Sequence, residues 1–147
     1  MRACPPLTAL LLAALAALPA AAQESAAGAR VEPGDGAAIA VPSGQAVTLQ
    51  DVIWNAPGPD GATMRFRFVA PGIAPAGGVD FETASADMQH LCDTYALPRV
   101  ADQVPVPQQV IISLSDVPVP FGEAAPEATQ FFESYRIEDG LCVWEMF

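Results

Sequence analysis

The sequence predicts an α+β fold in which one helix packs on a mainly antiparallel sheet of about five strands, in the order β-β-α-β-β-β. Three observations predict this fold. Residues 63–70 alternate apolar and polar side chains, the pattern of a half-buried antiparallel strand. Residues 81–96 place their apolar side chains within a stripe of about 120° on a helix. Asp139-Gly140 lies between two apolar runs, which is a strong signal of a two-residue hairpin turn.

The other elements follow from local residue choice. A first strand is predicted at residues 47–55, where β-branched and aromatic side chains accumulate, and a turn rich in Pro and Gly follows it at 56–61. Asp80 is a good N-cap for the helix, and Leu97-Pro98 predicts the end of the helix. Further strands are predicted at residues 109–115, 129–138 and 141–147, the last as a buried terminal strand.

The beginning of the chain has the organisation of a secretory signal peptide. Arg2 precedes an apolar run at residues 7–18, and small residues follow, so we expect cleavage after Ala22. Residues 23–42 lack periodicity and are predicted to be a flexible lead-in to a single domain at residues 43–147. The predicted location is therefore the periplasm or the outside of the cell. The apolar run is too short for a membrane span, and none is expected in the mature chain.

The charge balance excludes several classes of function. The chain carries 17 acidic and six basic residues, giving a net charge of −11, so nucleic acid is not expected as a partner. A cationic periplasmic or envelope protein is the partner that this charge favours. The chain has no lysine and a single histidine, which excludes Schiff-base chemistry and zinc sites with two histidines. No cofactor or metal is expected, and a non-enzymatic binding module is favoured over an enzyme.

Two cysteines remain after cleavage, Cys92 and Cys142, and they are predicted to form a disulfide in an oxidising compartment. A pair of buried thiols and a redox pair are the alternatives. His90 is two residues from Cys92, which turns the two side chains about 200° apart on a helix. We therefore expect a solvated histidine there and not the base of a thiol nucleophile.

Two further groups of residues are candidate binding sites. Arg65 and Arg67 project from one face of a strand and would suit an anionic group, although a cross-strand ion pair between Asp51 and Arg67 also explains this pattern. The loop at residues 117–126 is a candidate partner-binding surface, and an ordered lid over the core is its alternative. The central residues of that loop are Val119, Pro120, Phe121 and Gly122.

Three segments carry a resemblance to a known family: residues 87–98 (DMQHLCDTYALP), 111–116 (IISLSD) and 128–147 (ATQFFESYRIEDGLCVWEMF). With them the chain resembles a family of small exported bacterial proteins with a domain of unknown function. Some members carry an automatic label of acetolactate synthase, which the residues do not support. Those thiamine-diphosphate enzymes are several times larger, and Asn55 is the only asparagine available for their magnesium motif.

We therefore expect a small exported acidic domain, and most of all a non-enzymatic protein-binding module of the periplasm. The alternative is a small anion-binding or hydrolytic domain that uses Arg65 and Arg67. A purely structural domain of a larger envelope assembly is a third hypothesis. The resemblance supplies no catalytic residue to any of the three.

Overall fold

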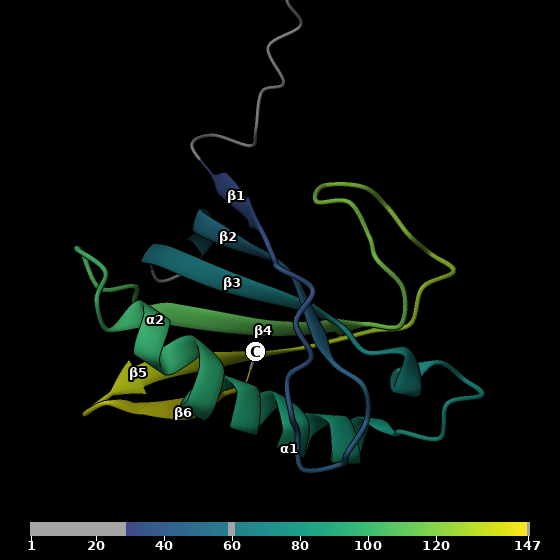
Figure 1. Cartoon of the computed structure of the whole chain (residues 1–147). Coiled ribbons are helices and arrows are strands. Elements are labelled where there is room, and N and C mark those ends of the chain that lie inside the picture. The colour runs from purple at the N-terminus through teal and green to yellow at the C-terminus, as the bar shows by residue number, and fades with distance from the viewer. Residues whose placement is uncertain (1–28, 59–60, 147) are drawn as a thin grey trace, which may run out of the picture.

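The computed structural model describes residues 29–58 and 61–146, and it shows one helix lying across a six-stranded sheet (Figure 1). The strands follow one another across the sheet in sequence order, and all neighbours are antiparallel except β3 and β4, which are parallel. The predicted α+β class, with one helix packed on a sheet, is confirmed. The sheet is mixed and has six strands, whereas a mainly antiparallel sheet of about five strands was predicted. The predicted signal peptide lies outside the described residues. The strands are β1 (Arg30–Pro33), β2 (Thr48–Gly58), β3 (Gly61–Val69), β4 (Gln109–Ser115), β5 (Gln130–Glu138) and β6 (Leu141–Glu145).

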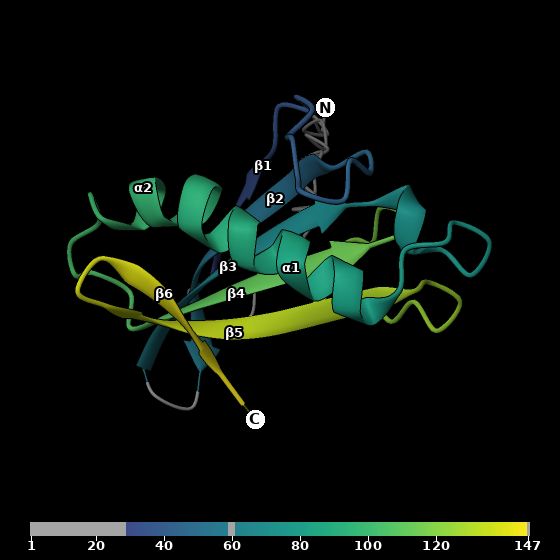
Figure 2. The same ribbon diagram turned by 90° about the horizontal axis from the view of Figure 1, so that it is seen from below.

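The helix is the crossover between the parallel strands β3 and β4 (Figure 2). It runs without interruption through α1 (Phe81–Leu91), a π-helical turn η3 (Cys92–Ala96) and α2 (Leu97–Val100). Asp80 caps it as predicted, accepting a 2.9 Å hydrogen bond from the Thr83 N–H. The predicted end at Leu97-Pro98 is wrong. Pro98 stands in the first turn of α2, where its missing N–H is tolerated, and the wider π turn before it keeps the chain helical.

The chain joins the sheet earlier than its composition indicates. Residues 30–33 lie in the predicted lead-in at 23–42, yet they form the edge strand β1 and pair with residues 51–54 of β2. All four side chains of β1 are exposed, so no apolar pattern marks this strand. Backbone pairing with β2 holds it, together with the hydrogen bond from the Trp54 indole N–H to Glu32 at 3.0 Å and the Arg30 guanidinium 4.8 Å from the centre of the Trp54 ring. Gly34 follows at a close approach, since a Cβ atom there would lie 2.1 Å from the Leu49 carbonyl oxygen.

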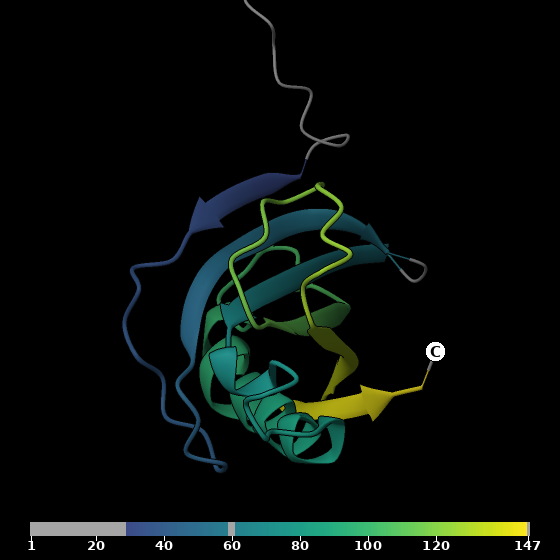
Figure 3. The same cartoon turned by 90° about the vertical axis from the view of Figure 1, so that its right-hand side faces the viewer.

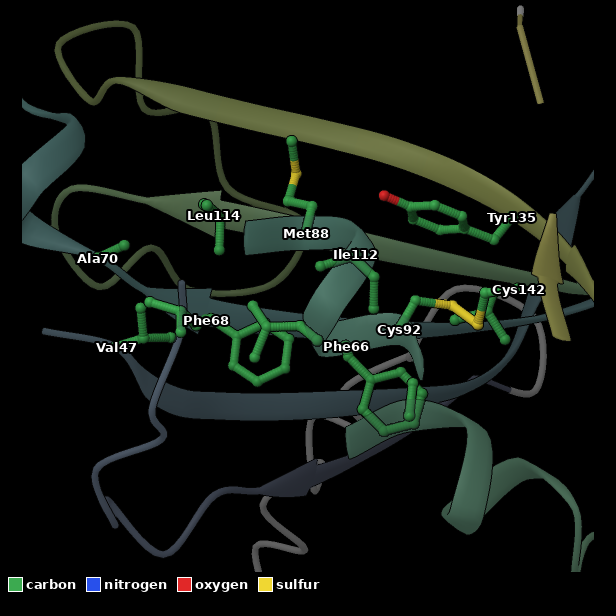
Figure 4. Close-up of a cluster of buried hydrophobic side chains, with 14 of the residues drawn as sticks. Val47, Phe66, Phe68, Ala70, Met88, Cys92, Ile112, Leu114, Tyr135 and Cys142 are labelled. Carbon is green, nitrogen blue, oxygen red and sulfur yellow. A yellow bond between two sulfur atoms is a disulfide. The ribbon is translucent and has the colours of Figure 1, made fainter. Parts of the chain in front are cut away.

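The core lies between the helix and the sheet face that the helix covers, which we call the inner face (Figure 4). The helix contributes Ala84, Met88, Leu91 and Cys92, as predicted, whereas Phe81 of the same predicted stripe is 50% exposed. Phe81 is the first helical residue and packs on the side of the core, edge-to-face with Phe131 at 5.3 Å. The sheet contributes Met64, Phe66, Phe68, Val110, Ile112, Leu114 and Tyr135.

The opposite face of the sheet, the outer face, is partly covered by the loop between β4 and β5. Figure 3 shows this loop, residues 116–129, passing across β2. The Gln50 side chain holds it at two points, donating to the Val119 carbonyl at 2.7 Å and accepting from the Val119 N–H at 3.1 Å. Phe121 packs there against Ile53 and Ala29. The loop is therefore an ordered strap across the outer face.

Candidate functional site

Cys92 and Cys142 form the predicted disulfide, with their Cα atoms 6.1 Å apart. The bridge ties the π turn of the helix to the edge strand β6. Beside it, Gln89 Nε2 donates a 3.1 Å hydrogen bond to the Cys142 carbonyl. His90 is half-buried on the helix, and because the Cys92 sulfur is in the disulfide, the two residues form no thiol–base pair.

Arg65 and Arg67 lie on the outer face of β3, but they have different surroundings. Asp51 faces Arg67 across the β2–β3 pair, and the two side chains form a 3.1 Å ion pair, the cross-strand pair that the sequence analysis gave as the alternative to an anion site. Arg67 also donates to the Val119 carbonyl, and its guanidinium lies 5.8 Å from the centre of the Phe121 ring. Arg67 thus binds Asp51 and helps to hold the strap in place. The Arg65 side chain makes no ion pair or hydrogen bond with any of the described residues.

Burial has the largest effect on the pKa of the Asp51 carboxyl group in this ion pair. The Asp51 pKa is raised above its ordinary value because burial penalises the ionised form more than the Arg67 charge and the Gln50 hydrogen bond favour it. The side chains of Asp51 and Arg67 are 9% and 11% exposed. The ion pair therefore lies on the outer face of the sheet but is largely shielded from solvent.

The four central loop residues do not present a common surface. Val119 is 5% exposed and Phe121 is half-buried, because both side chains turn toward the sheet. Pro120 and Gly122 are exposed, and Gly122 has a φ of 81°, a conformation that favours glycine. The apolar side chains that made this loop a candidate partner surface are the ones that anchor it.

Another surface of the molecule brings together features that suit recognition. A hollow of about 270 Å³, which we call the aromatic–acidic hollow, opens between the start of the helix, the start of β5 and the end of β6. Three aromatic side chains, a thioether and two carboxylates line it, and no basic residue does. Its lining residues are Phe81, Phe132, Glu133, Trp144, Glu145 and Met146.

Local structure explains why these three segments meet. The Asp80 cap starts the helix at Phe81, whose ring is fixed against Phe131 of β5. At the other side, the two-residue turn at Asp139-Gly140 has positive φ angles of 50° and 75° and folds β6 back along β5. The predicted hairpin is thereby confirmed, and it sets Trp144 opposite Tyr135.

Glu133 is the more buried of the two glutamates that line the hollow. It is 5% exposed and accepts two short hydrogen bonds of 2.6 Å, one from the Ser85 hydroxyl and one from the Tyr135 hydroxyl. Burial raises the Tyr135 pKa, and the hydrogen bond to Glu133 and the Glu133 charge raise it further, so Tyr135 remains a neutral donor. No basic side chain pairs with Glu133 within the described residues, whereas Glu145 is paired with Arg136 at 2.7 Å.

The sequence indicated these residues only in part. The terminal run at 141–147 was predicted as a buried strand, but Trp144 is 50% exposed and Met146 is 80% exposed. Helical periodicity placed Phe81 on the core-facing stripe, whereas Phe132 was assigned only to a strand. The signal that could have found the hollow is the density of aromatic and acidic residues in 131–147, which exceeds what one buried strand face accommodates.

Over residues 29–58 and 61–146, no group of three or more His, Cys, Asp or Glu side chains is arranged to hold a metal ion. In the same ranges no helix is long and apolar enough to cross a membrane. Together, the fold and the hollow define a small α+β domain that is built around one helix and exposes a hollow lined by aromatic and acidic side chains.

The chain belongs to the family of unknown function DUF6497, which it matches over residues 12–147. This match covers the whole of the described fold. No curated protein and no solved structure matches the chain.

Proposed function

We propose that this protein is a non-enzymatic binding module of the cell envelope that recognises a positively charged partner protein. An Arg or Lys side chain of the partner enters the aromatic–acidic hollow. The observation that carries this proposal is that exposed aromatic side chains and acidic side chains meet in one hollow. Among the described residues, three aromatic side chains are at least half exposed, and all three line this hollow: Phe81 (50%), Phe132 (57%) and Trp144 (50%). Two glutamates, Glu133 and Glu145, line the same hollow.

The chemistry of the lining favours an organic cation. Aromatic faces attract a guanidinium or ammonium group through the ring quadrupole, most strongly at tryptophan. The buried Glu133 carboxyl group, whose hydrogen-bond donors are the Ser85 and Tyr135 hydroxyl groups, adds an acidic acceptor at the wall of the hollow. The aliphatic stem of a lysine or arginine would pack on Met146 and the rings while its charged end meets Glu133.

The charge of the whole chain supports the same partner. The net charge is −11, and most of the described arginines are already engaged within the fold. Arg30, Arg67 and Arg136 pair with acidic side chains, and Arg99 stacks on Tyr95 at 3.5 Å. A surface with this acidic excess attracts a cationic protein at long range and gives fast association at low salt. The signal-peptide pattern and the disulfide support an envelope location.

Calorimetric titration with a hexalysine peptide tests the proposal. We expect the wild-type protein to bind hexalysine and to bind it more weakly as salt is raised. Trp144→Ala should weaken binding by at least about tenfold, as loss of an aromatic anchor does.

The matched control is Leu141→Ala, because Leu141 is 62% exposed on the same strand but lies outside the hollow. This variant should bind hexalysine within about twofold of wild type. Equal losses in the two variants, or no binding of hexalysine to the folded wild-type protein, would contradict the proposal.

A further inference from the structure

A second, separate feature lies on the outer face, where a row of paired residues crosses the sheet. The register places Ile53 and Ile111 on either side of Arg65, and Ser134 next to Ile111 on the following strand. Arg65 is thus flanked by two isoleucines that are 0% and 8% exposed. Its direct cross-strand neighbours on both sides are therefore apolar and buried.

Arg65 is the exception among the arginines of the described residues. Arg30, Arg67 and Arg136 each have a carboxylate within 4 Å, and Arg99 donates to the Tyr95 carbonyl at 2.7 Å. Arg65 makes no hydrogen bond or ion pair within the described ranges, and its Nε atom is buried without a partner. The chain has 17 acidic residues, yet none of the carboxylates in residues 29–58 and 61–146 pairs with this cation.

The surroundings of Arg65 disfavour its charge. Burial lowers the Arg65 pKa, and the positive charge of the neighbouring Arg67 lowers it further. An unpaired, partly buried cation reduces stability unless something compensates for it, so such a group needs an explanation outside the packing of the fold.

Two hydroxyl groups lie near Arg65 on the outer face, one on the adjacent strand β4 and one on β5, the strand beyond it. Ser113 of β4 lies opposite Arg67 and therefore diagonal to Arg65, and it is half-buried. Ser134 of β5 is fully buried, and its Oγ atom has no hydrogen-bond partner. The outer face of β3, β4 and β5 thus holds the unpaired Arg65 guanidinium group and two hydroxyl groups. The carboxylates in the same rows lie on the flanking strands and have arginine partners: Asp51 of β2 pairs with Arg67, and Glu145 of β6, opposite Ser134, pairs with Arg136.

We infer that Arg65 and Ser113 form a binding site for an oxyanion, a carboxylate or a phosphate group, on the outer face of β3 and β4. The guanidinium group offers paired N–H donors to two oxygen atoms, and the serine hydroxyl adds a third donor. Ile53, Ile111 and the strap exclude water around the ion pair, which strengthens it. Arg67 holds the strap and is not required to touch the anion.

This site is on the opposite face of the sheet from the core and uses none of the residues of the aromatic–acidic hollow. The anion site can therefore be tested independently of the proposed function. A Trp144 variant leaves it intact, and an Arg65 variant leaves the hollow intact.

Thermal unfolding of the wild-type protein and of Arg65→Met tests the inference, because methionine retains an apolar stem over Ile53 and Ile111. The probes are inorganic phosphate and acetate, each compared with chloride at equal ionic strength. We expect the preferred anion to raise the wild-type Tm by about 5 °C at ten times its Kd. Phosphate and acetate in separate arms distinguish a phosphate group from a carboxylate.

Arg65→Met should show no such response and should unfold in chloride at the wild-type Tm or above it, because the variant removes an unpaired charge. It also controls for general salting-out, which would persist in the variant. Arg99→Met, which alters an arginine on the helix, should keep the wild-type response. The inference is overturned if neither anion raises the wild-type Tm, or if Arg65→Met responds as wild type does.

Discussion

A single helix side chain, Asp87, fixes a loop that is more than 40 residues away in the sequence. Its carboxylate is fully buried and accepts hydrogen bonds from the Ser43 N–H at 2.9 Å, the Ser43 hydroxyl at 2.5 Å and Gln45 Nε2 at 2.7 Å. Asp87→Ala should therefore destabilise the fold by about 3 kcal/mol, because three donors lose their acceptor. Urea unfolding measures this loss.

The control for this variant is Asp93→Ala, since Asp93 is exposed on the same helix and accepts only one side-chain hydrogen bond, from Gln89. Its free energy of unfolding should change by less than about 0.5 kcal/mol. If the two variants are equally stable, the carboxylate of Asp87 does not hold the loop at 43–45.

Asp51 gives a prediction about pH at the same scale. Its pKa in the folded state is raised above 3.8, so the folded protein binds this proton more tightly than the unfolded chain does. The contribution of Asp51 is therefore fully present below pH 3.8 and is lost as pH rises through the raised pKa. The Tm of wild type minus that of Asp51→Asn should increase as pH is lowered from 7 to 4. A decrease would mean that the Arg67 ion pair dominates over burial.

At the scale of elements, the strap depends on the two-point contact between Gln50 and Val119. Gln50→Ala should leave the Val119 N–H without its acceptor and should speed its hydrogen exchange by at least about tenfold, because the loop then opens locally. The core strand β4 should exchange as in wild type. Equal exchange of the Val119 N–H in both proteins would show that Arg67 and Phe121 hold the strap by themselves.

Most elements could be predicted from the sequence because their signals are local. Alternation in residues 63–70, the apolar helix stripe and the Asp139-Gly140 turn each depend on neighbours in the chain. Strand β1 could not be predicted, since its four side chains are exposed and its contacts are with β2, more than 15 residues further along the chain. The parallel β3–β4 pair was missed because side-chain alternation does not report strand direction.

The candidate sites were less predictable because they depend on convergence. Arg65 and Arg67 look alike in the sequence, and only the position of Asp51 and the folded-back strap separate a paired arginine from an unpaired one. The hollow needs the start of the helix, the start of β5 and the end of β6, which are up to 65 residues apart. Helical periodicity assigned Phe81 to the core, but Phe81 is 50% exposed. Periodicity gives the face of a helix on which a residue lies and does not show where the sheet beneath that face ends.

At the scale of the whole molecule, the disulfide joins the helix to an edge strand that is 50 residues away. Closing a loop of this length contributes about 4 kcal/mol on the chain-entropy model. The reduced protein should therefore lose about that much free energy of unfolding in a urea titration. A loss below about 1 kcal/mol would show that core packing alone seats β6 on the helix.

The central claim, that the aromatic–acidic hollow receives a cation, is tested most directly by the two indole N–H signals in a ¹H–¹⁵N NMR titration with hexalysine. Trp144 lines the hollow, whereas Trp54 lies on β2 and donates its indole N–H to Glu32 at 3.0 Å, so it is an internal reference. The Trp144 signal should shift progressively and saturate while the Trp54 signal stays in place. A Trp144 signal that does not move, or one that moves no more than that of Trp54, would contradict the claim.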